Sequence, residues 1–221
     1  MAADGIFVNF PDYQVNTETA AGKQPLGHGM VIAVDPANGQ TRGSEYGRYT
    51  NDGNIRGKAL RVKVPSLKMA NPGNPTQEEL DTYAKLLDQW YNDPSKNPNR
   101  HSGGRTQITY VRDADYNKLV DMMKSAETQQ DKGYYQTKPY SILNHNCGTY
   151  AADMLKAASP ALARLKWKAT SIDASPSGWS TFGTPGMSAP KSILMPRAEY
   201  DNPNVKNPSL LEHLWKVVTK K

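Results

Sequence analysis

One cysteine and one histidine, far apart in the sequence, are of the types that a hydrolase site requires. Cys147 is the only cysteine in 221 residues, and it lies where a polar loop, 144–146, gives way to an amphipathic helix. A thiol at a helix N-terminus feels the positive end of the helix dipole, which favours the reactive thiolate. His28 precedes an apolar run at 30–34, which is typical of a buried strand. A thiolate and an imidazole base together predict nucleophilic cleavage of an amide bond.

His28 is the preferred base among the four histidines. His101 falls in a predicted surface loop, and His213 falls in a predicted C-terminal helix. His145 is the alternative base, but it lies only two residues before Cys147, where side chains can share a side without forming a stable ion pair. The competing interpretation makes Cys147 a small buried apolar residue and His28 a core histidine at a strand edge.

A third residue must hold the second nitrogen of the imidazole base. The turn at 35–39 predicts a hairpin that places Glu45 or Tyr46 opposite His28, and the register of the two strands decides which one shares its face. Glu45 is the more effective partner because a carboxylate also stabilises the imidazolium. The alternative for Glu45 is a solvated charge on a strand. Asp35 is discounted because it lies at the far end of the strand.

The oxyanion that forms during amide hydrolysis needs hydrogen-bond donors. The backbone N–H of Cys147 is one donor, because first-turn N–H groups have no partner within a helix. Gly148 allows a substrate to approach the backbone closely. Asn146 and Gly148 are therefore candidates for supporting the oxyanion, and Tyr46 remains a candidate third member.

The elements that position these residues follow from periodicity and from helix-capping residues. Strands are predicted at 6–10, 28–34, 40–49, 58–64 and 107–111. Helices are predicted after a Thr76–Glu79 capping box, after Asp113 or Asp115, from Cys147 to about Ala158, and from about 207. This order of strands, then helices, then tail favours an α+β fold.

Two parts of the chain differ in composition. Residues 1–169 are expected to form the hydrolase domain, with an inserted helix and loops at 68–105. Residues 170–221 are expected to form an extended arm, rich in Ser, Pro and Gly at 170–208, and a final helix packed on the same domain.

Composition limits the classes of partner. The net charge of +6 favours anionic surfaces, but Lys and Arg are scattered, so we expect no nucleic acid partner. No apolar run approaches the roughly 20 residues of a membrane span, and no secretory signal is visible. We therefore expect a protein that stays in the cytoplasm or leaves by a route without a cleavable signal. The dispersed histidines and single cysteine predict no metal, no cofactor and no internal disulfide.

These motifs resemble a known superfamily. The histidine-first strand, the returning Glu-Tyr-Gly-Arg-Tyr at 45–49 and the later Asn-Cys-Gly-Thr-Tyr-Ala at 146–151 are similar to circularly permuted members of the NlpC-type papain-like superfamily. In the unpermuted form the cysteine helix precedes the histidine strand. The resemblance covers about 26–50 and 105–158, and it is strongest to the small cell-wall amidase effectors of type VI secretion.

The resemblance implies a papain-like antiparallel sheet packed against the cysteine helix. It implies that Cys147 is the nucleophile, His28 the base and Glu45 the third member of a triad that cleaves peptide bonds in peptidoglycan stems. It also implies a monomer exported to the periplasm of a target cell, with an immunity protein and a component of the secretion apparatus as partners. The gap between the histidine and the third member is longer than in the compact unpermuted hairpins.

Two other functions remain open. The same triad could act on an acyl or lipid substrate, as in the permuted relatives of lecithin retinol acyltransferase, which need an apolar channel or a membrane anchor. A non-catalytic binding or structural module would instead keep Cys147 merely buried. Thiol reactivity discriminates between a catalytic and a structural cysteine, because only a thiol with a lowered pKa alkylates readily at pH 6.

Overall fold

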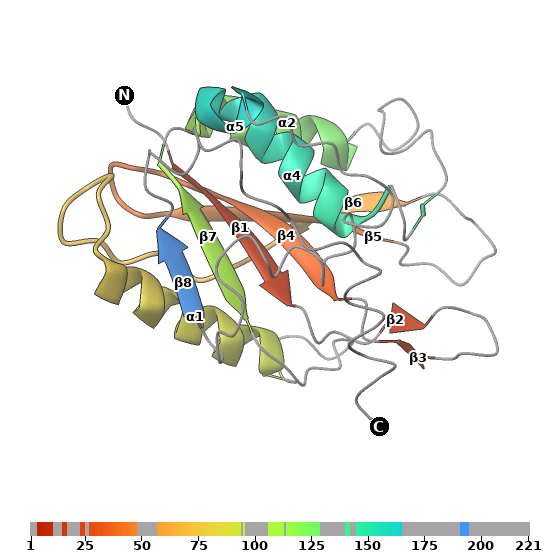
Figure 1. The fold of residues 1–221 in the computed structure, drawn as a ribbon, viewed down its shortest axis with the longest axis horizontal. Coiled ribbons are helices and arrows are strands. Elements are labelled where there is room, and N and C mark those ends of the chain that lie inside the picture. Colours follow the sequence, from red (N-terminus) through yellow and green to blue (C-terminus); the bar gives the residue numbers. More distant parts are fainter. Residues whose placement is uncertain are drawn as a thin grey trace.

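A six-stranded sheet is the centre of the fold, with helices on both of its faces (Figure 1). The computed structural model describes residues 4–10, 15–16, 23–24, 27–47, 57–93, 95, 106–112, 114–128, 140–141, 145–164 and 191–194. In spatial order the strands of the sheet are β6 (Lys58–Val62), β5 (Thr41–Gly47), β4 (His28–Val34), β1 (Asp4–Phe10), β7 (Gln107–Val111) and β8 (Lys191–Leu194). The first five are antiparallel to their neighbours, and β8 runs parallel to β7. A separate hairpin consists of β2 (Val15–Asn16) and β3 (Lys23–Gln24).

The N-terminal strand is longer and more central than the sequence predicted. β1 pairs with β4 on one side and with β7 on the other, and all seven of its residues are buried. The other predicted strands are confirmed within a few residues. β8 falls inside the predicted extended arm, where neither periodicity nor turn residues mark its four residues as a strand.

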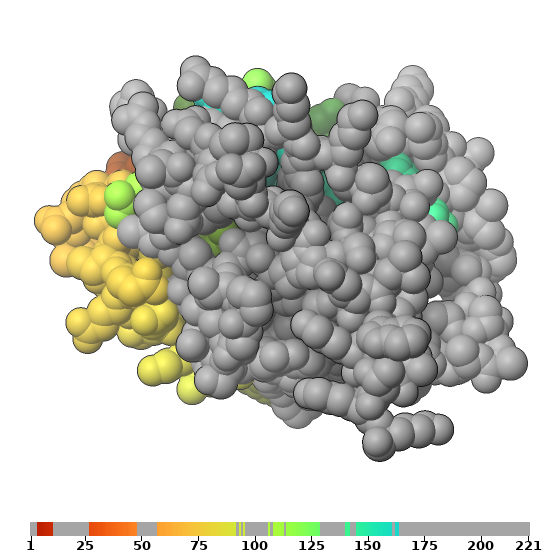
Figure 2. Space-filling model, viewed as in Figure 1, coloured from red at the N-terminus to blue at the C-terminus, as the bar shows by residue number. Residues whose placement is uncertain are grey.

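The helix α1 (Gln77–Asn92) covers one face of the sheet. Its predicted capping box is present: Glu79 N–H donates to Thr76 Oγ1 at 3.2 Å, and Thr76 N–H donates to Glu79 Oε2 at 2.7 Å. Its apolar residues pack against the sheet, and α1 belongs to the yellow region at the left of the molecular surface (Figure 2).

Three helices cover the opposite face: α2 (Tyr116–Thr128), α4 (Cys147–Ala158) and α5 (Pro160–Arg164). Asp115 Oδ1 accepts the N–H of Lys118 at 3.0 Å and so caps α2, whereas Asp113 lies outside the described residues. α4 ends before Pro160, as predicted. The predicted helix from 207 and most of the predicted loop at 92–105 also lie outside the described residues.

The sheet separates two apolar cores. The core beneath α4 and α2 includes Phe7, Val31, Ala33, Tyr46, Leu119, Met123, Tyr150, Met154 and Leu155. The core beneath α1 includes Ile6, Val8, Phe10, Met30, Ile32, Val34, Leu80, Tyr83, Leu87 and Tyr110. Alternate residues of β1 and β4 contribute to opposite cores, which is why 6–8 and 30–34 are continuous apolar runs.

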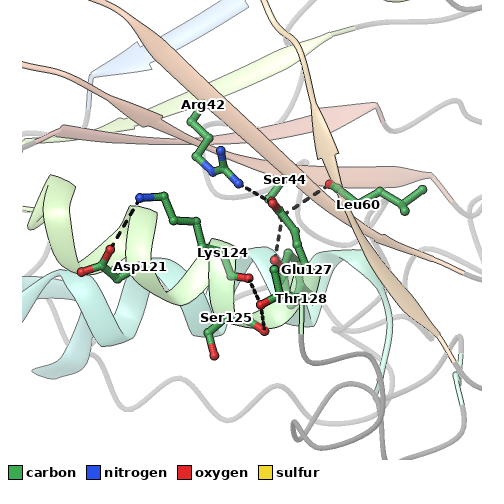
Figure 3. Close-up of polar contacts among 9 residues, drawn as sticks. Arg42, Ser44, Leu60, Asp121, Lys124, Ser125, Glu127 and Thr128 are labelled. Atoms are coloured by element: carbon green, nitrogen blue, oxygen red, sulfur yellow. Dashed lines mark hydrogen bonds and ion pairs between the residues drawn. The ribbon is translucent and has the colours of Figure 1, made fainter.

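Polar contacts attach two of these helices to β5 (Figure 3). Arg42 forms an ion pair with Glu127 of α2, and both side chains are largely buried. Ser44 Oγ and Tyr150 Oη form a buried hydrogen bond of 2.8 Å between β5 and α4. Because Ser44 precedes Glu45 and Tyr150 lies one turn after Cys147, this bond helps to set the position of the cysteine helix relative to β5.

Asp4 is a fully buried carboxyl at the start of β1. Burial raises its pKa to about 6, against the opposing effects of Tyr110 and Arg112. The folded protein therefore holds this proton more tightly than the unfolded chain, and stability is lost as the pH rises from about 4 through 6. We expect Asp4→Asn to leave stability unchanged at pH 4 and to increase it at pH 8 by up to about 3 kcal/mol. Urea unfolding at the two pH values measures the difference, and an equal effect at both would contradict the expectation.

Candidate active site

His28 and Glu45 are joined across the β4–β5 hairpin. His28 Nε2 lies 3.0 Å from Glu45 Oε2, and both side chains are buried. The hairpin was predicted to place Glu45 or Tyr46 directly opposite His28, but the observed register pairs Glu45 with Met30. His28 and Met30 point to the same face because they are two residues apart in one strand. Glu45 therefore reaches His28 along the diagonal, which a long side chain can span.

Tyr46 points to the other face of β5. Its ring stacks on Tyr150 with centroids 5.6 Å apart and lies within the core beneath α4. The pKa of Tyr46 is raised by burial, although the backbone of Gly57 hydrogen-bonds its hydroxyl. The register thus places Glu45 beside His28 and places Tyr46 in an aromatic cluster.

Cys147 is the first residue of α4, and a capping box holds this helix end in place. Asn146 Oδ1 accepts the N–H of Thr149 at 3.0 Å, and Thr149 Oγ1 accepts the N–H of Asn146 at 2.9 Å. The reciprocal pair fixes the first turn, and with it the backbone of Cys147 and Gly148. Asn146 is therefore the N-cap residue of α4. The Asn-x-x-Thr spacing at 146–149 is the signal in the sequence for this box.

Cys147 and His28 meet at the end of β4. A Cβ added to Gly29 would lie 3.4 Å from Gly148 Cα, so the strand and the first turn of α4 are in van der Waals contact there. The Cys147 sulfur hydrogen-bonds the His28 side chain and also accepts from the backbone N–H groups of Gly29 and Gly148. Because Nε2 of His28 faces Glu45, Nδ1 is the ring nitrogen left for the sulfur.

The two groups change each other's proton affinity. Burial opposes ionisation of Cys147, but the charge and hydrogen bond of His28 and the two backbone N–H groups outweigh it, so the pKa of the thiol is lowered. Burial also opposes protonation of His28, but Cys147 and Glu45 outweigh it and raise the pKa of the imidazole to about 9. Both shifts favour the thiolate–imidazolium form of the pair, in which the sulfur is nucleophilic.

The site is nearly closed to solvent. Cys147 is 2% exposed, Glu45 1% and His28 9%. Phe10 stacks at 6.3 Å from His28, and Tyr91 stacks on Phe10 at 3.7 Å, both measured between ring centroids. His28 is the most accessible of the three groups.

The other histidines do not join this cluster in the described part of the chain. The ring of His145 meets Tyr46 edge to face at 5.4 Å, and its backbone forms a bridge with Ser141. His101 and His213 lie outside the described residues. Within the described ranges there is no group of three or more metal-ligating side chains. Among the helices of the described residues, none combines the length and the apolar composition needed to span a membrane.

We expect Glu45→Gln to weaken the site without abolishing it. Replacing the carboxylate removes a charge-assisted hydrogen bond worth about 1.5–3 kcal/mol, or a roughly 10- to 150-fold loss of kcat/KM. Without the negative charge the pKa of His28 falls, so the decline of activity at high pH should begin at a lower pH than in the wild type. A pH–rate profile measures both effects.

Tyr46→Phe is the matched control for Glu45→Gln. Its hydroxyl lies on the other face of β5, so the alkaline limb of the profile should stay where it is in the wild type. A larger effect from Tyr46→Phe than from Glu45→Gln would contradict the assignment of Glu45 as the partner of His28.

Comparison with known proteins identifies the family. Residues 5–162 match the type VI secretion system effector TseH-like family, and the chain belongs to this family. Among solved structures, the crystal structure of the type VI secretion system effector TseH is similar, with 26% sequence identity and a TM-score of 0.55. The similarity covers 76% of this chain and 80% of that chain. Among curated proteins, nothing matches the chain.

Proposed function

We propose that this member of the TseH-like effector family is a cysteine hydrolase of the permuted papain-like type, which cleaves peptide bonds in peptidoglycan stems. One observation carries the proposal: the Cys147 sulfur, the His28 imidazole and the Glu45 carboxylate form a continuous hydrogen-bonded chain at the N-terminus of a helix. Such a chain supplies a nucleophile, a base and a group that orients the base.

The first half of the reaction transfers the acyl group to the enzyme. The Cys147 thiolate attacks the carbonyl carbon, and a C–S bond forms while the carbonyl π electrons move to oxygen. The intermediate collapses and the C–N bond breaks, while imidazolium His28 gives its proton to the departing amine. The products are a thioester on Cys147 and a free amine.

Water completes the cycle. Neutral His28 takes a proton from water, and the resulting hydroxide attacks the thioester carbon. The C–S bond then breaks, so that a carboxylic acid leaves and the thiolate–imidazolium pair is restored. Glu45 accepts a hydrogen bond from His28 Nε2 throughout, which keeps Nδ1 directed at the sulfur and stabilises the imidazolium.

The substrate class rests on two further considerations. Family membership makes the chain one of a group of type VI secretion effectors, and such effectors act on components of a target cell. The net charge of +6 suits an anionic polymer such as the cell wall. We propose that the protein acts in the periplasm of the target cell, and that an immunity protein protects the producing cell.

The test is the identity of the bond that is cleaved. Purified sacculi are digested with the protein, and the soluble fragments are analysed by mass spectrometry and by labelling of new amino groups. We expect soluble fragments whose masses show that one water was added at a stem peptide bond. Each cleavage should also produce one new amino group. Cleavage only at glycosidic bonds, or no soluble fragments at any protein concentration, would contradict it.

A further inference from the structure

Asn9 is a buried polar residue that the reaction above does not use. Its side chain is 2% exposed, and within the described residues neither Oδ1 nor Nδ2 has a hydrogen-bond partner. A buried carboxamide without a partner lowers the stability of the fold, and an apolar side chain of similar shape would not. Such a group in a central strand calls for a functional explanation.

The register of the sheet shows where this side chain points. Asn9 pairs directly with Gly29 of β4, and side chains of paired residues project from the same face. That face is the one covered by α4, because a Cβ on Gly29 would lie 3.4 Å from Gly148 Cα. Phe7, two residues before Asn9, also packs in the core beneath α4. The Asn9 carboxamide therefore lies beside the first turn of the cysteine helix.

Within the described part of the chain, one N–H of the first turn of α4 is left for a substrate oxygen. Thr149 N–H is bound to Asn146 Oδ1, and Gly148 N–H points to the Cys147 sulfur. The backbone N–H of Cys147 remains, at the positive end of the helix dipole. An oxyanion is stabilised by preorganised donors aimed at the oxygen, and removal of one such donor has a large effect on turnover.

We propose that Asn9 Nδ2 is the second donor of the oxyanion hole, together with the backbone N–H of Cys147. This inference rests on the proposed function. When the C–S bond forms and the carbonyl π electrons move to oxygen, that oxygen accepts hydrogen bonds from both groups. When the C–N bond breaks and the C=O bond re-forms, the charge on oxygen falls and both bonds weaken. No proton leaves Asn9 at either step.

The test separates stabilisation of the oxyanion from reactivity of the thiol. Asn9→Leu and Asn9→Ala remove the donor, and Asn117→Leu on the exposed surface of α2 is the control for the substitution itself. Each variant is assayed for kcat on a soluble muropeptide, for alkylation of Cys147 by iodoacetamide and for thermal unfolding. Alkylation by iodoacetamide displaces iodide and forms no oxyanion, so it does not need the hole.

We expect both Asn9 variants to lose about 10²- to 10³-fold in kcat and to alkylate at the wild-type rate. Asn9→Leu should unfold at the wild-type temperature or above it, since it removes an unpartnered polar group from the interior. A structural role for Asn9 would not combine unchanged stability with lost turnover.

Two results would overturn this inference alone: wild-type kcat in both variants, or parallel loss of turnover and alkylation in both. If the wild-type protein releases no amine from peptidoglycan, the proposed function fails, and the inference fails with it. The wild-type assay therefore distinguishes the two failures.

Discussion

Cys147→Ala should abolish the digestion of sacculi, with a loss of at least about 10³-fold in the rate of amine release. The thioester cannot form without the sulfur, and no other cysteine exists in the chain to replace it. The melting temperature should stay close to that of the wild type. The substitution removes one small side chain at a helix terminus, and His28 retains its hydrogen bond to Glu45.

The measurement is amine release from sacculi by equal concentrations of the two proteins, with thermal unfolding in parallel. The Asn146–Thr149 capping box does not involve the sulfur, so far-ultraviolet circular dichroism should be identical for both. Hydrolysis at a substantial fraction of the wild-type rate would rule out the covalent mechanism.

The second large effect is expected from His28→Ala. Removal of the imidazole takes away the base that activates water, the acid that protonates the departing amine, and the cation that lowers the pKa of Cys147. Acid–base catalysis alone contributes about 10²- to 10⁴-fold, so kcat/KM should fall by at least about 100-fold. Steady-state kinetics on a soluble muropeptide measure the loss.

His145→Phe is the matched control for this substitution. His145 is the other candidate base from the sequence, and its ring packs edge to face on Tyr46 rather than on the sulfur. Phenylalanine retains an aromatic ring in that cluster, so the variant should keep most of the activity. If His145→Phe proved inactive while His28→Ala kept wild-type turnover, the base would have been assigned to the wrong histidine.

The sequence predicted those parts of the fold that depend on local patterns. The Thr76–Glu79 capping box and the turn at 35–39 consist of contacts between residues close in the chain, and the apolar run at 30–34 is a local pattern that marks β4. The turn is held as expected, with Ala37 N–H donating to Asp35 Oδ1 at 2.9 Å. Local contacts of this kind can be recognised from residue types and spacing alone.

The choice between Glu45 and Tyr46 could not be made from the sequence. It depends on strand register, and a shift of one residue exchanges the faces on which the two side chains lie. In the structure the register of β4 and β5 runs from the pair Met30 and Glu45 to the pair Val34 and Thr41. The hydrogen bond between Ser44 and Tyr150 was also beyond prediction, because 106 positions separate its two residues.

Asn9 shows why part of the candidate site was missed. In the sequence it is one polar residue in a short apolar stretch, and no spacing connects it with Cys147. Its position becomes informative only when β1 is placed beside β4, because that pairing brings it next to Gly29 and the cysteine helix. Long-range strand order is set by packing of the whole sheet rather than by any local motif.

The pairing of sulfur and imidazole is the central claim, and the pH dependence of alkylation tests it most directly. The rate at which iodoacetamide modifies Cys147 is measured from pH 5 to 10 in the wild type and in His28→Ala. The account predicts that the wild-type rate rises at a clearly lower pH than the rate of the variant, which should rise only near the ordinary thiol pKa of about 8.5. Two superimposable curves that both rise near pH 8.5 would contradict it.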